Sequence, residues 1–112
     1  MWEMSTLKIE DEIELFFNKV TGTLDTLERK KLVQFVNLML SAYYDGRNIF
    51  VFGNAGSGDT ASHFCGDFLK GISYGLENRF KIICLNDNKS AFMAIANDVC
   101  YEDIFVEQLK NF

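Results

Sequence analysis

Asp59, His63 and Asp67 stand four residues apart on a segment with helical periodicity, and His63 is the only histidine of the chain. Side chains with this spacing lie on one face of a helix. A histidine and an aspartate placed in this way can hold one metal ion, or can act as a general acid and base in which the carboxylate orients the imidazole. The alternative is a solvated charged face without chemistry, and the spacing alone leaves both interpretations open.

A glycine-rich loop comes directly before these residues. Gly53, Gly56 and Gly58 have the spacing G-x-x-G-x-G within the stretch FGNAGSGD. This is neither the dinucleotide motif G-x-G-x-x-G nor a Walker A motif, which needs a lysine, so a nucleotide site is disfavoured. Backbone N–H groups at a helix start, the Asn54 amide and the Ser57 hydroxyl suit a phosphate monoester or a sugar hydroxyl. The alternative is a strand-to-helix turn that needs only glycine and an N-cap serine.

Two short apolar runs flank the loop and the helix that follows it. Residues 49–52 and 81–85 are rich in β-branched, aromatic and aliphatic side chains, which predicts two buried parallel strands. Between them the apolar positions recur at helical spacing, so the segment is expected to form a βαβ unit with a right-handed crossover. These positions are Ala61, Phe64, Cys65, Phe68 and Leu69.

Helical periodicity predicts further helices on both sides of this unit. Before it, one helix with apolar positions from Ile9 to Val20 ends at Gly22, and a second, capped by Asp25 or Thr26, ends at Asp45-Gly46. After it come a turn over 86–88, a short helix over 90–97 and a last helix from Tyr101. Asn97-Asp98 is expected to cap the last helix or to contact a ligand.

The expected fold class is α/β, with a helical hairpin over residues 1–47 and part of a sheet domain over 48–112. Because two parallel strands make a poor sheet, we expect the sequence to be cut off within its fold. The hairpin offers an aromatic set that could form an oligomer interface, although such stripes are more often core. The set is Trp2, Phe16, Phe17 and Phe35.

The composition excludes several classes of function. A net charge of -5 and a pI near 4.7 argue against a nucleic-acid ligand, which requires a basic surface. The three cysteines lie in apolar runs, which favours buried thiols over disulfides or a metal knuckle. With no apolar stretch of spanning length and no signal-peptide profile, we expect no membrane association and a cytoplasmic location.

The string FGNAGSGDTASHF, followed by LNDNKSAFMAIANDVCYEDIFVEQL, resembles the sugar isomerase (SIS) domain of bacterial phosphoheptose isomerases. In that family a GNGGS loop leads to a helix with H-F-x-x-[ED], and a GND-x-x-[YF]-x-[ED]-x-F block follows the second strand. The resemblance covers about residues 48–112, the N-terminal portion of such a domain. It implies a flavodoxin-like three-layer αβα fold, a homotetramer with active sites between subunits, and aldose-ketose isomerisation of sedoheptulose 7-phosphate, often with zinc.

The resemblance also assigns roles to matching positions. The implied substrate contacts are Asn54, Ala55, Gly56, Ser57 and Asp98, and the implied catalytic positions, which are also the zinc-binding ones, are His63 and Asp67. An aldose-ketose isomerisation proceeds through an enediol and needs a base near neutral pKa and a group that stabilises the developing oxyanion.

Three departures from the family pattern bear on activity. Ala55 replaces the second glycine of the loop, which is tolerable if that position keeps a negative φ. Asp67 replaces the usual glutamate, and a misplacement on the order of 1 Å can cost about a hundredfold in rate. The second phosphate loop and the C-terminal glutamine and histidine of the family are absent from this sequence. We therefore expect weak or no turnover from this chain, and the alternative is a non-catalytic SIS module that senses a sugar phosphate or binds a protein partner.

Overall fold

A computed structural model describes residues 6–112, with side chains from Lys8 onward. The chain divides into two compact units, with the boundary between Val36 and Asn37. The division at residues 47 and 48 expected from the sequence stays a prediction. Met39 and Tyr43 precede that division but pack within the second unit, Met39 in its apolar core and Tyr43 against the Phe80 ring.

The first unit consists of helix α1 (Thr6–Asp25) and the beginning of α2 (Arg29–Tyr44). Both predicted helices therefore form, although α1 continues past Gly22 to Asp25. Their aromatic side chains are open to solvent: Phe16 is 63% exposed and Phe35 50%. An oligomer interface here stays a prediction, and Trp2 lies outside the described residues. None of the helices in residues 6–112 has the length and hydropathy that a membrane span requires.

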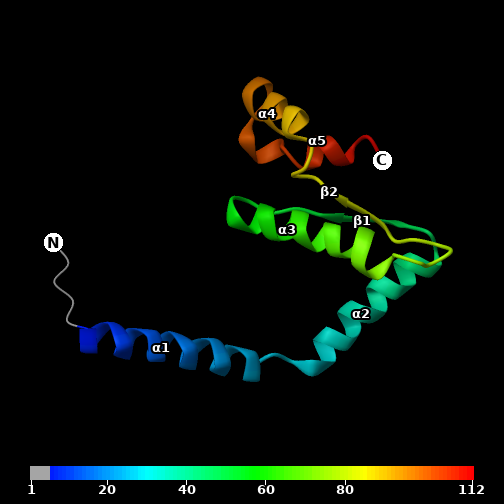
Figure 1. Cartoon of the computed structure of the whole chain (residues 1–112). Helices are drawn as coiled ribbons and strands as arrows, with labels where there is room; N and C mark the ends of the chain where they lie inside the picture. Colours follow the sequence, from blue (N-terminus) through cyan, green and yellow to red (C-terminus); the bar gives the residue numbers. More distant parts are fainter. Residues whose placement is uncertain (1–5) are drawn as a thin grey trace. The chain divides into compact units, whose positions relative to one another are not determined.

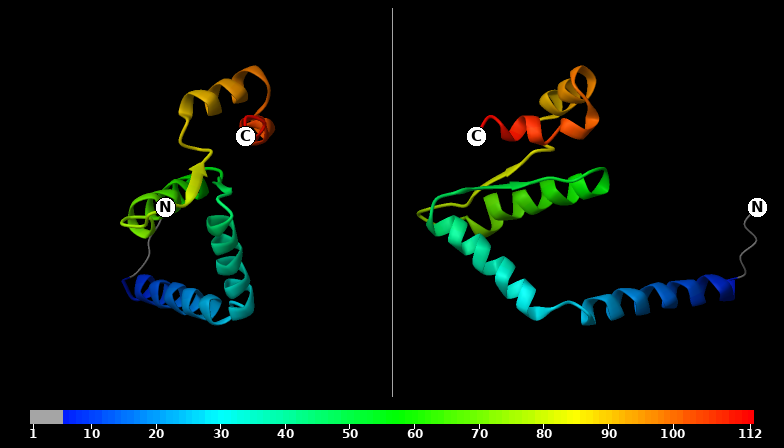
Figure 2. Two further views of the ribbon diagram at one scale, coloured as in Figure 1. Left: turned by 90° about the vertical axis from the view of Figure 1, so that its right-hand side faces the viewer. Right: turned by 180° about the vertical axis from the view of Figure 1, so that it is seen from behind.

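The second unit contains the predicted βαβ arrangement. Strands β1 (Asn48–Val51) and β2 (Lys81–Cys84) pair in parallel, in a register that sets Asn48 against Lys81 and Val51 against Cys84. Helix α3 (Gly56–Gly66) connects them and lies along the strands (Figures 1 and 2). Each strand ends one residue earlier than the sequence predicted: β1 does not include Phe52, and β2 does not include Leu85.

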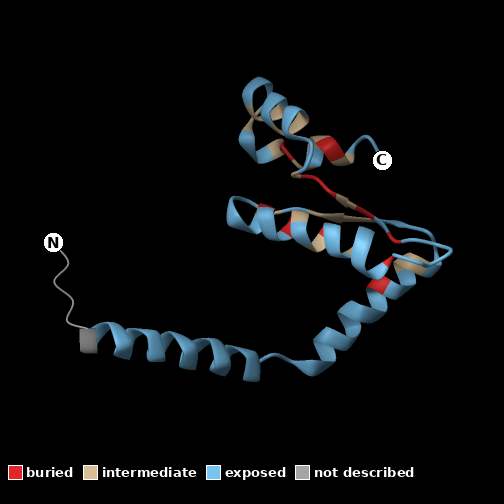
Figure 3. Cartoon of the chain, viewed as in Figure 1, coloured by how far each residue is buried: buried red, intermediate tan, exposed pale blue. Residues whose placement is uncertain are grey.

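The two faces of this short sheet are covered by different elements. Because side chains alternate along a strand, Ile49 and Val51 pack with the core cluster that includes Ala61 and Cys65 of α3. On β2 the residues of this cluster are Ile82 and Cys84, and Figure 3 shows the buried residues gathered along β2 and α3.

The opposite face is covered by the C-terminal segment. The Phe50 ring lies 4.9 Å from the Phe112 ring, and the Phe52 ring lies 4.6 Å from the Phe105 ring, centroid to centroid. Helices therefore cover both faces, which confirms the expected α/β class with an αβα layering.

Helical segments after α3 differ in detail from the sequence expectation. A π-helical turn, η1 (Asp67–Ile72), continues α3, and α4 (Lys89–Asp98) follows β2. The predicted last helix is instead a 3₁₀ turn, η2 (Tyr101–Asp103), and a short α5 (Val106–Leu109). A cap at Asn97-Asp98 was wrong, because both residues belong to the last turn of α4.

The prediction of buried thiols is confirmed for two of the three cysteines. Cys65 and Cys84 are 3% and 6% exposed, whereas Cys100 is only partly buried. All three are free thiols. Two of them thus belong to the core between α3 and the sheet.

Candidate phosphate-binding loop

A tight turn over residues 54–57 links β1 to α3. The Ser57 N–H donates to the Asn54 carbonyl at 3.0 Å, and Ala55 has φ 48° and ψ −127°. These angles are close to those of the first central residue of a type II′ turn, roughly +60° and −120°, a position that favours glycine. Ala55 therefore does not keep the negative φ on which its tolerance was expected to depend, and a non-glycine residue there costs about 1–3 kcal/mol.

Close packing explains two of the three glycines of the motif. A Cβ on Gly53 would lie 2.6 Å from the Ser57 backbone, and one on Gly58 would lie 2.7 Å from Nδ2 of Asn86. A Cβ on Gly56 would meet open space. Gly53 and Gly58 are thus required by the close approach of the loop, the first turn of α3 and Asn86, whereas packing does not require Gly56.

Asn86 holds the loop from the neighbouring strand. Its Oδ1 accepts from the Gly53 N–H at 3.0 Å, and its Nδ2 donates to the Gly53 carbonyl at 2.7 Å. Asn86 stands two residues beyond Cys84, and Gly53 two residues beyond Val51, which is the register partner of Cys84. The carboxamide therefore extends the strand pairing by a side chain where the backbone pairing has ended.

The loop presents hydrogen-bond donors at the start of α3. Within residues 6–112, the N–H groups of Ala55 and Gly56 and the Ser57 hydroxyl have no hydrogen-bond partner. Ala55 occupies the N-cap without a side-chain bond, so the interpretation of Ser57 as the N-cap was wrong. Unpaired donors at a helix N-terminus, where the helix dipole is positive, favour an anionic oxygen.

A pocket of about 520 Å³ opens beside the loop, at the carboxyl ends of the two strands. Of the predicted substrate contacts only Ala55 lines it. Asp59 and Asp87 contribute negative charge to the wall and Lys89 a positive charge, and the Ser62 hydroxyl donates to Oδ1 of Asp87 at 2.6 Å. Carboxylates suit sugar hydroxyls, while the lysine suits an anionic group.

The predicted pair of His63 and Asp67 forms on the exposed side of α3 and η1. Nε2 of His63 lies 3.6 Å from Oδ2 of Asp67, and the two side chains are 84% and 64% exposed. Both residues line a shallow depression of about 560 Å³ together with Asp59 and Ser62, which also line the pocket beside the loop. The depression and the pocket therefore adjoin along α3, and the common face of Asp59, His63 and Asp67 is confirmed.

The His63–Asp67 pair can be tested for its fit to zinc. Two ligands that each lie about 2.0 Å from a tetrahedral ion are roughly 3.3 Å apart, close to the distance seen. Within residues 6–112, no group of three or more His, Cys, Asp or Glu residues is placed to hold a metal ion. The pair thus fits two corners of a zinc site, and further ligands would have to come from elsewhere in an assembled protein.

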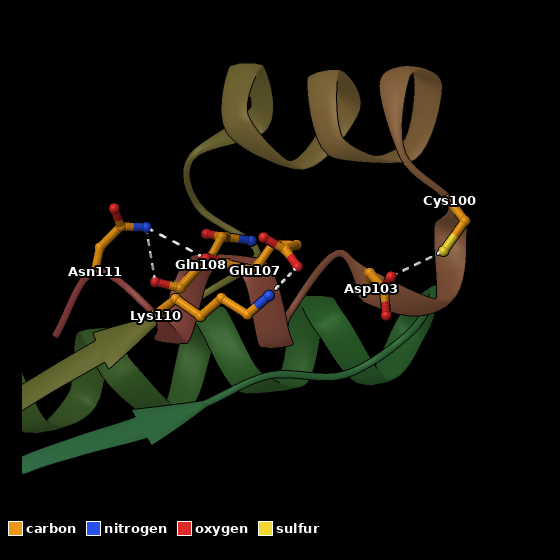
Figure 4. A network of polar contacts seen from close by, with 6 residues as sticks. All are labelled: Cys100, Asp103, Glu107, Gln108, Lys110 and Asn111. Carbon is orange, nitrogen blue, oxygen red and sulfur yellow. Dashed lines mark hydrogen bonds and ion pairs between the residues drawn. The ribbon is translucent and has the colours of Figure 1, made fainter.

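Asp98 does not line the pocket beside the loop. It ends α4, and its Oδ1 accepts from the Asn97 amide at 2.8 Å. The residue of this segment that does reach the loop is Tyr101, whose hydroxyl donates to Oδ1 of Asn54 at 2.9 Å. The η2 turn that carries Tyr101 is closed by the Cys100 thiol, which donates to Oδ2 of Asp103 at 3.2 Å (Figure 4).

Sequence reasoning missed Asn86, Lys89 and Tyr101. Asn86 was assigned only to a turn, yet it follows β2 as Gly53 follows β1, and adjacent parallel strands end at the same edge. That rule would have placed Asn86 and Lys89 beside the loop. Tyr101 stands at the aromatic position of the block after the second strand, but nothing local indicates its contact with Asn54, which joins residues 47 positions apart.

Comparisons with known proteins agree with this geometry. No family model matches the chain. The phosphoheptose isomerase of Thermodesulfovibrio yellowstonii is 29% identical over 114 residues, which cover 93% of this chain and 53% of the relative. That of Helicobacter pylori is 37% identical over 83 residues, 73% of this chain and 42% of the relative. The lincomycin biosynthesis protein LmbN of Streptomyces lincolnensis is 38% identical over 73 residues, 65% of this chain and 26% of the relative.

The solved structure of phosphoheptose isomerase GmhA from Neisseria gonorrhoeae has the same fold over most of this chain. The match has a TM-score of 0.79 at 23% identity and covers 93% of this chain and 55% of that one. This chain spans about half the length of the phosphoheptose isomerases that it matches. The chain belongs to the phosphoheptose isomerase-like members of the SIS family, as the loop and the residues after its second strand indicated.

Proposed function

We propose that this chain binds a sugar phosphate at the loop over residues 54–57 and forms part of a phosphoheptose isomerase-like protein acting on sedoheptulose 7-phosphate. The observation that carries the proposal is the set of unpaired donors at Ala55, Gly56 and Ser57, presented where a helix begins. In this arrangement the phosphate lies against the loop, and the sugar chain extends along α3 toward Asp59. Asp98 contacts a hydroxyl of the same ligand.

The chemistry is assigned to the His63–Asp67 pair. Both side chains are exposed, and such a surface pair contributes only about 0–1 kcal/mol to stability, so the fold does not require it. Asp67 removes a proton from one of two adjacent sugar carbons and returns it to the other. His63 either orients the Asp67 carboxylate or binds zinc together with it. A bound zinc ion would supply Lewis-acid polarisation of the sugar carbonyl.

Assembly and location follow as parts of the same proposal. The His63–Asp67 pair is exposed, and the chain has a single histidine. Both features fit an active site that residues of another subunit complete, as in a homotetramer. The free thiols fit the reducing cytoplasm.

A non-catalytic SIS module that senses a sugar phosphate or binds a protein partner is the second candidate. It is favoured by the short arm of Asp67, which is 64% exposed and, among the described residues, is paired with His63 alone. The two candidates share the loop and differ only in the role of this carboxylate.

Calorimetric titration of the chain with sedoheptulose 7-phosphate, sedoheptulose and inorganic phosphate tests the shared claim. We expect the phosphorylated sugar to bind more tightly than either of its parts. No binding at millimolar concentration would contradict the proposal. The two candidates are separated in the full-length protein, because weak or no turnover is expected from this chain alone. There, turnover that Asp67→Asn abolishes while binding persists would assign the enzyme, whereas binding without turnover in the unmutated protein would favour the sensing module.

A further inference from the structure

The hydrogen bond between Tyr101 and Asn54 contributes little to the fold. Tyr101 is 52% exposed and Asn54 is also exposed, so water competes for both polar groups. A neutral hydrogen bond in reach of water adds little net stability. The contact nevertheless joins the start of η2 to the loop expected to bind the ligand.

The Tyr101 side chain is held from both directions along the chain. Its ring stands edge-on to Phe92 with centroids 6.3 Å apart, and Phe92 in turn lies 6.2 Å from Phe105. In the same turn the Cys100 thiol donates to the Asp103 carboxylate, and Ile104, which follows the turn, is 1% exposed. The position of the Tyr101 hydroxyl is therefore set by the packing of its ring and of the turn that carries it.

The same aromatic packing reaches the loop. Phe105 lies 4.6 Å from Phe52, which stands two residues before Asn54. The segment that carries Tyr101 and the loop that carries Asn54 are thus connected by the packing of Phe105 on Phe52 in addition to the hydrogen bond. Their relative position does not depend on the bond itself.

The bond fixes which end of the Asn54 carboxamide faces outward. Tyr101 occupies Oδ1, and because the carboxamide is planar, the direction of Nδ2 is then set as well. In the described residues Nδ2 has no partner, so its two N–H groups remain available. An asparagine without such an anchor would have to be ordered when a ligand binds, and the lost side-chain freedom would weaken binding.

We propose that Tyr101 is a positioning residue for ligand binding, which holds Asn54 so that its Nδ2 group donates to an oxygen of the bound sugar phosphate. This inference rests on the proposed function of the loop. Tyr101 itself does not contact the ligand. Its effect on binding therefore passes through Asn54.

A double-mutant cycle tests this route with sedoheptulose 7-phosphate as the probe. Tyr101→Phe removes only the hydroxyl and is expected to weaken binding by roughly two- to tenfold. In the Asn54→Ala background the same change is expected to have no effect. Tyr74→Phe is the matched control, since Tyr74 is exposed and contacts Lys70 rather than the loop. An unchanged affinity of Tyr101→Phe, or an equal loss in the Asn54→Ala background, would overturn the proposal.

A spectroscopic readout separates this inference from the proposed function. In ¹⁵N-correlated spectra without ligand, the side-chain amide resonances of Asn54 should shift in Tyr101→Phe and stay in place in Tyr74→Phe. Identical Asn54 resonances in Tyr101→Phe and the wild-type chain would overturn the positioning role. If the wild-type chain binds no sugar phosphate, the proposed function fails, and these resonances still decide whether Tyr101 holds Asn54.

Discussion

The carboxamide of Asn86 pairs with both backbone polar groups of Gly53, at 3.0 Å and 2.7 Å, and so continues the parallel pairing of β1 and β2 past the last strand residue. This pairing fixes the base of the loop on which the proposed function depends. A strained turn persists only where several independent contacts hold it in place. Here Asn86 holds one end of the turn and the first turn of α3 holds the other.

Removal of the Asn86 side chain should destabilise the chain. Asn86→Ala leaves the half-buried Gly53 N–H and carbonyl without partners, at a cost of about 1–3 kcal/mol. Urea unfolding measures the change. Asn78→Ala is the control, because Asn78 is exposed and its side chain makes no hydrogen bond in the described part of the chain. Equal midpoints for the two variants would show that the pairing contributes nothing.

The glycines of the loop should differ sharply in their tolerance of alanine. Gly58→Ala sets a Cβ 2.7 Å from Nδ2 of Asn86 and 2.9 Å from the Gly53 carbonyl, and overpacking of this kind costs about 1–3 kcal/mol. Gly56→Ala meets open space at the start of α3 and is expected to be neutral or to stabilise the helix by up to about 1 kcal/mol. Thermal unfolding of the two variants compares them within one turn of helix. A Gly58→Ala variant as stable as Gly56→Ala would refute the close packing.

Ala55→Gly should stabilise the chain, against the usual sign for a change to glycine. Relief of the strain at φ 48° outweighs the added freedom of the unfolded chain, for a net gain of about 0.5–2 kcal/mol. The matched control is Ala94→Gly on the exposed side of α4, which should lose about 1 kcal/mol. Chemical denaturation of both variants measures whether each change raises or lowers the free energy of unfolding. A loss of stability in Ala55→Gly would mean that the II′ conformation is not the one adopted in solution.

The three thiols should react in a definite order. Burial raises the pKa of Cys65 and of Cys84, and the hydrogen bond to Asp103 is the main cause that raises the pKa of Cys100. Access then decides the order, because Cys100 is only partly buried. Iodoacetamide at pH 8 with mass spectrometry should label Cys100 first and the other two only after unfolding. Labelling of Cys65 at the rate of Cys100 in the folded chain would contradict the packing of α3 on the sheet.

The same raised pKa values give a direction for the pH dependence of stability. A thiol that holds its proton more tightly in the folded state stabilises that state fully below its unfolded pKa, about 8.5. This contribution is lost as the pH rises through the higher pKa of the folded state. Urea midpoints should therefore decrease as the pH is raised above about 8.5. A midpoint that rises over this range would show that the buried thiols are not protonated in the folded chain.

The sequence predicted the parts of this structure that depend on local patterns. The apolar runs at 49–52 and 81–85 identified both strands. The helical spacing identified α3 and a buried side from Ala61 to Phe68, but Leu69, which like Phe68 lies in η1, is 48% exposed. Both strand ends were overestimated by one residue. Phe52 packs against Phe105, and the Leu85 carbonyl accepts from Gln108, although the Leu85 N–H still donates to the Val51 carbonyl.

The candidate site was less predictable because its support comes from distant residues. The loop and the His63–Asp67 pair are visible in the sequence as glycine spacing and as an i, i+4 pattern. The bonds of Asn86 to Gly53 and of Tyr101 to Asn54 span 33 and 47 positions. The positive φ of Ala55 depends on this tertiary support and on the tight turn before α3. Alanine at that position gives no signal for it.

The central claim is that a sugar phosphate binds at the loop over residues 54–57. Its most direct test is an amide-resolved NMR titration of the ¹⁵N-labelled chain with sedoheptulose 7-phosphate, with unphosphorylated sedoheptulose as the reference. The account predicts that the backbone amides of Ala55 and Gly56 shift most strongly, because neither N–H group has a hydrogen-bond partner within residues 6–112. Shifts that leave these two amides in place, or that the unphosphorylated sugar reproduces, would contradict it.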